Sequence, residues 1–306
     1  MRHHAGIIMC AAVVTGAGLQ AQPTFRAGVD LVTFGVSVVD QAGRLVTDLR
    51  EDDFEIREDG TPQTLASFAR GDAADELARV RLGLLMDVSG SMERDLALAR
   101  TAAIKFLNAL PEAQDITLVD YDTQVRVSRY GQADFPRLVE RIRTGKLGGW
   151  TAFYDALGVY LDSVDLMDGR KVLVMYGDGL DTRSALRFGE MMTLLKASDV
   201  TVYAIGFIGH QPGNARMEGR LRLTRVAEAT GGQAFFPSAL KDLDEAYAKV
   251  LAEIRGQYHL GYVSTNRTTD GAWRRVEIRL TRPGLRVRAR EGYFAPYVEP
   301  PPAGLP

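Results

Sequence analysis

The chain has 306 residues, enough for one large domain or two smaller ones, and its 46% hydrophobic and 25% charged residues are ordinary for a soluble globular protein. The 37 basic and 39 acidic residues nearly balance, giving a net charge of -2. This balance argues against nucleic acid as the main partner.

The first residues predict export. Arg2, His3 and His4 precede an apolar run over residues 5–19, and small residues follow up to Ala21, so residues 1–21 have the pattern of a secretory signal peptide. The single cysteine, Cys10, lies inside this run, so the mature chain would have no disulfide and no thiolate metal site. No later run reaches the ~20 apolar residues of a membrane helix. We therefore expect a secreted or periplasmic protein with no membrane span after signal removal.

Two β segments flank the centre of the chain. Apolar residues alternate with polar or small ones in residues 24–70, and again in residues 258–297. Each segment is too short to bury a core alone. Since the termini of a domain commonly lie close together, we expect the two segments to pack as one β-sandwich domain with the central domain inserted between them. The proline-rich tail, residues 298–306, is expected to be disordered.

The central segment, residues 79–257, alternates strand and helix patterns. Strands are predicted at 82–86, 116–121, 125–130, 172–176, 200–208 and 233–236, and helices at 93–110, 135–142, 152–164, 185–197, 221–229 and 240–254. This alternation predicts βαβ units in a doubly wound, mostly parallel sheet with helices on both faces. The expected fold class is therefore α/β, with this domain inserted in a small β-sandwich.

Seven arginines between Arg274 and Arg290 admit two interpretations, a nucleic-acid patch or a solvated strand face. They largely alternate with apolar residues such as Val276, Ile278 and Val287. Because one face of an antiparallel sheet commonly meets water, this alternation favours the solvated face.

Five oxygen-bearing side chains are predicted to meet at one edge of the sheet. Asp87, Ser89 and Ser91 follow the strand at 82–86, Thr151 opens the helix at 152–164, and Asp178 follows the strand at 172–176. Ligand sites of open α/β sheets form at this carboxyl edge. Singly, these residues could be helix caps or turn residues. Together they provide two carboxylates and three hydroxyls.

Such a set of oxygen donors suits a hard divalent cation, Mg²⁺ or Mn²⁺, and the absence of His and Cys disfavours zinc and copper. Only two ligands carry charge, so the cation would remain electrophilic toward a further carboxylate. This favours a protein partner that offers an Asp or Glu side chain.

The three motifs carry a resemblance. Asp87-x-Ser89-x-Ser91, Thr151 in Gly-Gly-x-Thr-Ala-x-Tyr-Asp and Asp178 in Asp-Gly-x-Asp-Thr resemble the metal-ion-dependent adhesion site of von Willebrand factor type A domains, over residues 79–255. The resemblance implies that Ser89, Ser91 and Thr151 coordinate Mg²⁺ and that Asp87 and Asp178 act directly or through water. The flanking segments are similar to those of exported bacterial proteins related to these domains.

Three functions remain open. The expected one is a metal-dependent protein-binding or adhesion module, not an enzyme. The alternative is a metal-assisted hydrolase using the same oxygen cluster, but the motifs lack a second carboxylate beside the first, and His210 and His259 lie outside them. In a third interpretation the metal has only a structural role and holds the loops together. The loop at 209–214 follows a strand, so it is expected either to line the rim of the site or to be a simple connector.

Overall fold

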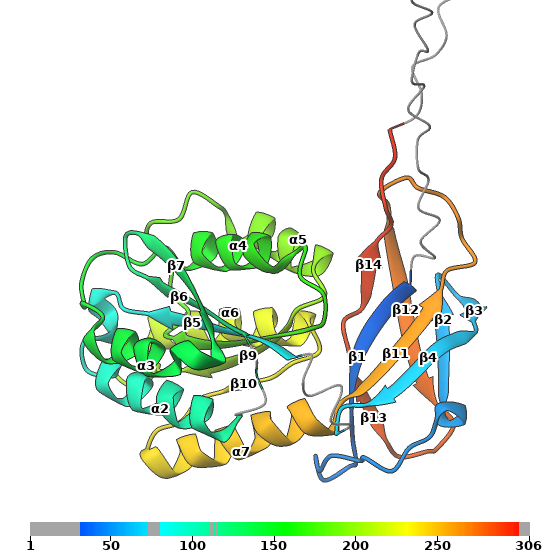
Figure 1. The fold of residues 1–306 in the computed structure, drawn as a ribbon, viewed down its shortest axis with the longest axis horizontal. Coiled ribbons are helices and arrows are strands. Elements are labelled where there is room, and N and C mark those ends of the chain that lie inside the picture. Colours follow the sequence, from blue (N-terminus) through cyan, green and yellow to red (C-terminus); the bar gives the residue numbers. More distant parts are fainter. Residues whose placement is uncertain (1–30, 73–79, 111–112, 114, 300–306) are drawn as a thin grey trace, which may run out of the picture.

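The chain forms two domains that lie side by side (Figure 1). The structure is a computed structural model and describes residues 31–72, 80–110, 113 and 115–299. Within this part of the chain, a six-stranded sheet with helices on both faces makes up one domain, and two four-stranded sheets make up the other. The predicted signal peptide at 1–21 and residues 300–306 of the predicted tail lie outside the described residues.

The larger sheet has the strand order β10-β9-β8-β5-β6-β7. Its strands are β5 (Val80–Asp87), β6 (Asp115–Tyr121), β7 (Val125–Gly131), β8 (Arg170–Gly177), β9 (Thr201–Gly206) and β10 (Ala234–Phe235). All neighbouring strands are parallel except β6 and β7. Every residue of the central strand β5 except Arg81 is buried, as expected where both faces of a parallel sheet are covered.

Two layers of helices cover this sheet. One layer contains α2 (Leu96–Ala109), α3 (Phe135–Thr144) and α7 (Leu240–Gly256), and the other contains α4 (Phe153–Val164), α5 (Phe188–Ala197) and α6 (Gly213–Ala229). Short 3-10 helices lie at η1 (Glu51–Asp53), η2 (Gly90–Met92) and η3 (Gln132–Asp134). Phe106 of α2 packs on Tyr247 of α7 with ring centroids 5.7 Å apart, so the last helix is fixed to the first layer.

One predicted helix boundary was wrong. The sequence placed a helix at 221–229, whereas α6 begins at Gly213 after Pro212 as its N-cap, with the Arg216 N–H donating to the Pro212 carbonyl over 2.8 Å. Gly213 and Asn214 are poor helix formers, so the sequence predicts a loop over these residues. The predicted rim loop is therefore shorter and ends at Pro212.

The second domain is a β-sandwich whose sheets each combine strands from both flanks of the chain. The sheet orders are β13-β1-β11-β4 and β14-β12-β2-β3. The strands are β1 (Leu31–Val39), β2 (Phe54–Glu58), β3 (Thr61–Gln63), β4 (Leu65–Arg70), β11 (Tyr258–Val263), β12 (Trp273–Leu280), β13 (Arg286–Arg288) and β14 (Gly292–Phe294). Phe34 pairs with Leu260 and Ile56 with Ile278, each pair across antiparallel strands from opposite flanks.

The core of the sandwich explains why the two flanks belong together. Phe34 and Tyr262 stack with centroids 6.2 Å apart, and Phe54 packs against Tyr258 at 5.1 Å. The Tyr258 hydroxyl also accepts a hydrogen bond from the Leu49 N–H at 2.9 Å. Each flank thus covers apolar surface that the other would expose, and the predicted fold class is confirmed.

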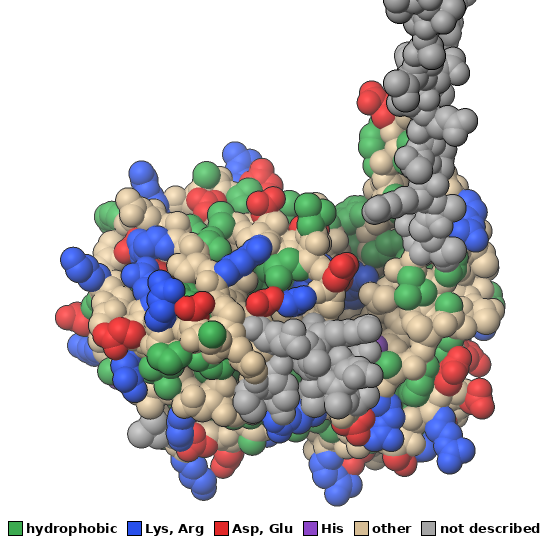
Figure 2. Space-filling view, viewed as in Figure 1, with side chains coloured by type: hydrophobic (Ala, Val, Ile, Leu, Met, Phe, Trp, Pro, Cys, Tyr) green, Lys and Arg blue, Asp and Glu red, His purple; other side chains and the backbone are tan. Residues whose placement is uncertain are grey.

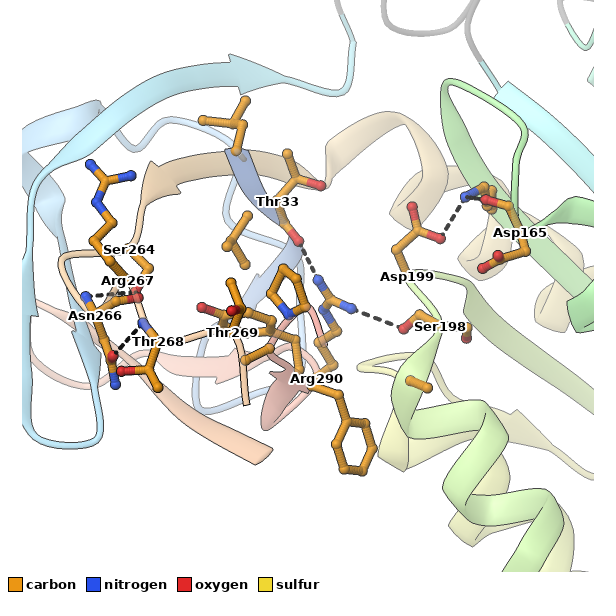
Figure 3. Close-up of a pocket in the computed structure, with 18 residues that line it drawn as sticks. Thr33, Asp165, Ser198, Asp199, Ser264, Asn266, Arg267, Thr268, Thr269 and Arg290 are labelled. Atoms are coloured by element: carbon orange, nitrogen blue, oxygen red, sulfur yellow. Dashed lines mark hydrogen bonds and ion pairs between the residues drawn. The ribbon is translucent and has the colours of Figure 1, made fainter. Parts of the chain in front are cut away.

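Arginines of the second domain hold the two domains together. Arg290 donates from Nη1 to the Ser198 carbonyl at 2.9 Å and from Nη2 to the Thr33 carbonyl at 2.8 Å (Figure 3). Arg288 donates to Gln233 Oε1 at 2.6 Å and forms an ion pair with Glu253 of α7. These side chains link the sheet that contains β1 and β13 to the α/β domain.

The solvated-face interpretation therefore holds only for some of the seven arginines. Arg275 and Arg279 are exposed, whereas Arg274 is buried. Arg288 and Arg290 form hydrogen bonds across the domain interface. Alternation shows which strand face a residue occupies, but it cannot show that another domain covers that face. On the face shown in Figure 2, basic and acidic side chains are interspersed. None of the helices in the described part of the chain is long and apolar enough to cross a membrane.

Candidate metal centre

The first part of the candidate site lies where β5 ends. Asp87 is the last residue of this strand and is buried. Its Oδ1 accepts a hydrogen bond from the Ser89 N–H over 2.9 Å, an Asx turn that leads the chain out of the strand. Ser89 is buried and Ser91 exposed, and their hydroxyl oxygens lie 3.1 Å apart. The end of the strand thus presents a carboxylate and two hydroxyls.

Asp178 comes from the neighbouring strand. β8 pairs in parallel with β5, with Tyr176 opposite Met86, so Asp178 emerges at the same edge as Asp87. A side chain at Gly177 would place its Cβ only 3.0 Å from the Asp87 Cβ, so glycine leaves room for the carboxylate there. Asp178 Oδ1 accepts from the Leu180 N–H over 3.0 Å.

Thr151 joins the site through its backbone. Its N–H donates to Thr182 Oγ1 over 2.9 Å, and its carbonyl accepts from the Thr182 and Arg183 N–H groups at 2.9 and 3.0 Å. Two residues earlier, the Gly149 carbonyl accepts from the Gly90 N–H over 3.2 Å. The Thr151 loop is therefore bonded both to the Asp178 loop and to the Ser89–Ser91 loop. The five predicted residues lie on three loops that are joined through the Thr151 loop.

The two carboxylates destabilise each other electrostatically. Burial, and then the charge of Asp178, raises the pKa of Asp87 to about 7, and burial likewise raises the pKa of Asp178. Asp87 Oδ2 is buried and has no hydrogen-bond partner among the described residues. A buried carboxylate oxygen without a partner costs free energy, and a bound cation would offset that cost.

The ligand types fit a hard cation. No group of three or more His, Cys, Asp or Glu side chains in the described residues could hold a metal ion. A metal at this edge would therefore depend on two carboxylates together with the hydroxyls of Ser89, Ser91 and Thr151. Such a set of oxygen donors suits Mg²⁺ or Mn²⁺. Asp87 Oδ2 is the oxygen of the set that lacks a positively charged or hydrogen-bonding partner in the described residues.

One further residue reaches the cluster from the loop after β9. Gln211 donates from Nε2 to Asp178 Oδ2 over 2.7 Å. Beside it, His210 Nδ1 lies 3.2 Å from both carboxylate oxygens of Asp95. The sequence indicated only that this loop belongs near the edge, because it follows a strand. The contact made by Gln211 depends on side-chain reach, which no pattern reveals.

Comparison with known proteins identifies the central segment. A sequence model of the von Willebrand factor type A domain matches residues 82–249, a range that includes all five cluster residues. No curated protein sequence matches the chain.

Several solved structures are similar to the chain at low identity. A von Willebrand factor type A structure from Catenulispora acidiphila shares 14% identity, covers 90% of this chain and 76% of that one, and gives a TM-score of 0.47. The pilus adhesin SpaC from Lactobacillus rhamnosus GG, in an open conformation, shares 11%, covers 80% and 48%, and gives 0.48. An aerotolerance-related membrane protein from Bacteroides fragilis shares 14%, covers 57% and 98%, and gives 0.46.

Proposed function

Because the chain belongs to the von Willebrand factor type A domain family, we propose that it is an exported, metal-dependent binding module that captures an acidic side chain of a partner protein. In this proposal Asp87, Ser89, Ser91, Thr151 and Asp178 hold Mg²⁺ or Mn²⁺. The bound cation supplies positive charge and an open coordination position for the carboxylate of the partner. The protein performs no catalysis.

One observation supports this proposal more than any other. Within the described residues, Asp87 Oδ2 is buried without a hydrogen-bond partner beside a second carboxylate, and a bound cation would offset the free-energy cost of this arrangement. Three of the five proposed ligands are neutral hydroxyls, so the cation would remain electrophilic and keep coordination positions for water. An Asp or Glu of a partner would take one of these positions.

Export of the module rests on the sequence pattern of residues 1–21. A binding module outside the cytoplasm meets partners at the cell surface or in the periplasm. The second domain is attached away from the cluster, because Arg288 contacts Glu253 of α7 and Arg290 contacts Ser198 just before β9.

The test is a pull-down from the native cell envelope in Mg²⁺, compared with EDTA and with the Asp87→Ala protein. The proposal expects partners that are retained only by the native protein in Mg²⁺. Retention that survives both EDTA and Asp87→Ala would contradict it. The same preparations are assayed with a chromogenic phosphate ester, since turnover abolished by Asp87→Ala would favour the metal-assisted hydrolase instead.

A further inference from the structure

Trp150 is exposed beside the candidate metal site. It immediately precedes Thr151, and 66% of its surface remains accessible. The other tryptophan of the chain, Trp273, packs edge-on against Phe294 with ring centroids 5.0 Å apart. Within the described residues the Trp150 ring contacts no other aromatic ring. A large apolar ring is thus left open to solvent at the rim of the cluster.

The loop that carries Trp150 is held in place by hydrogen bonds. The Gly148 N–H donates to the Val88 carbonyl over 3.0 Å, and the Trp150 N–H donates to Thr123 Oγ1 over 2.9 Å. Gly149 has φ +82, and a Cβ there would come within 2.5 Å of Thr123 Oγ1, so the path requires glycine. A fixed backbone reduces the entropy lost when a partner covers the ring.

A single exposed apolar side chain is ordinary on protein surfaces. Here, however, the same loop also exposes Leu147, with 38% of its surface accessible, and the lysine before it. In the described part of the chain neither Lys146 nor Arg143 forms an ion pair. The loop therefore offers two apolar side chains and unpaired positive charge next to a site suited to a carboxylate.

This chemistry identifies the kind of ligand. Building on the proposed function, we propose that Trp150 contacts the partner directly and that the partner segment carries an apolar side chain next to its metal-binding carboxylate. The indole and Leu147 cover that apolar side chain, and Lys146 favours an acidic segment over a basic one. Tryptophan is among the residues whose truncation most often weakens interfaces strongly.

The test uses three labelled synthetic peptides and the full chain in saturating Mg²⁺. The peptides are Gly-Phe-Asp-Phe-Gly, Gly-Gly-Asp-Gly-Gly and Gly-Phe-Asn-Phe-Gly, each acetylated and amidated, and binding is followed by surface-plasmon resonance on densely immobilised peptide. Trp150→Ala is compared with Trp150→Phe and with Tyr297→Ala, which removes an aromatic ring of 67% exposure from the other domain.

The native protein is expected to prefer the Phe-Asp-Phe peptide over the other two. Trp150→Ala should weaken that binding about thirtyfold, Trp150→Phe should restore part of it, and Tyr297→Ala should leave it unchanged. Equal binding of both Asp peptides by the native protein, unaffected by Trp150→Ala, would overturn this inference and leave the proposed function standing. Failure to bind any Asp peptide better than the Asn peptide would overturn both.

Discussion

Gln211 donates a hydrogen bond from Nε2 to Oδ2 of Asp178 over 2.7 Å, which ties the loop after β9 to a proposed metal ligand. The amide occupies an oxygen that a cation would also use. A hydrogen bond to a charged group contributes roughly 1.5–3 kcal/mol. The amide and the cation therefore compete for this carboxylate.

Removing the competing amide should strengthen metal binding. We expect Gln211→Ala to raise Mg²⁺ affinity about tenfold, because a tenfold change corresponds to ~1.4 kcal/mol, near the lower value of such a bond. Calorimetric titration measures the change, and Asn214→Ala, at an exposed position in the first turn of α6, is the matched control. Weaker Mg²⁺ binding in Gln211→Ala would show instead that the amide orients Asp178 for the metal.

The domain interface should depend on one arginine of β13 and not on its neighbour. Arg288→Met leaves the buried Glu253 carboxylate without its ion pair, which costs about 3 kcal/mol of unfolding free energy. Arg286→Met, at an exposed position on the same strand, should change that free energy by less than ~0.5 kcal/mol. Urea unfolding compares the two. Equal effects would mean that the Arg288–Glu253 contact contributes nothing specific.

His259 makes the stability of the protein depend on pH. Burial, and then the charge of Arg170, lowers the pKa of its imidazole from 6.5 to about 3. The unfolded chain therefore binds this proton more readily than the folded one. The contribution of His259 is fully present above pH 6.5 and is lost as pH falls from 6.5 toward 3.

The expected slope from this residue is at most ~1.4 kcal/mol per pH unit. Urea unfolding at a series of pH values measures it, and His259→Gln should flatten the curve in that window. Carboxylates also titrate there, so the difference between the two proteins is the quantity of interest. An unchanged slope in His259→Gln would contradict the prediction.

The two domains should differ in their ability to fold alone. Residues 78–257 contain the six-stranded sheet with its helices and should fold and bind metal, although loss of Arg288 leaves Glu253 unpaired. Residues 24–77 should be unfolded, because among the described strands β1 pairs only with strands from the other flank and β2 retains only β3. Circular dichroism of both fragments checks this. A near-ultraviolet circular dichroism signal of fixed aromatic side chains in the fragment of residues 24–77 would contradict it.

Much of the α/β domain could be predicted because its signals are local. The unbroken apolar run of β5 and the alternation of strands and helices determine a parallel sheet covered on both faces. The parallel order then brings the ends of β5 and β8 to one edge of the sheet. The sequence alone therefore predicts that Asp87 and Asp178 lie close together. The start of α6 at Gly213 was missed because local propensity opposes it.

The features that could not be predicted from the sequence depend on packing between distant segments. Arg288 and Arg290 alternate with apolar residues like any solvated strand, and only the position of the second domain shows that they face Glu253 and Ser198. The exposure of Trp150 and the reach of Gln211 likewise follow from loop geometry. A sequence pattern shows the periodicity of a strand or helix, whereas these contacts depend on the position of the end of each side chain in the folded protein.

The most direct test of the central claim is calorimetric titration of Mg²⁺ into the native chain and into Asp87→Asn. Asp134→Asn, which removes a carboxylate from the exposed Asp134–Arg137 pair, is the control for charge. The native protein and Asp134→Asn are predicted to bind one Mg²⁺ with the same affinity, and Asp87→Asn is predicted to bind none while keeping its circular dichroism spectrum. Equal Mg²⁺ affinity in Asp87→Asn, or no binding by the native protein, would contradict a metal centre at this edge of the sheet.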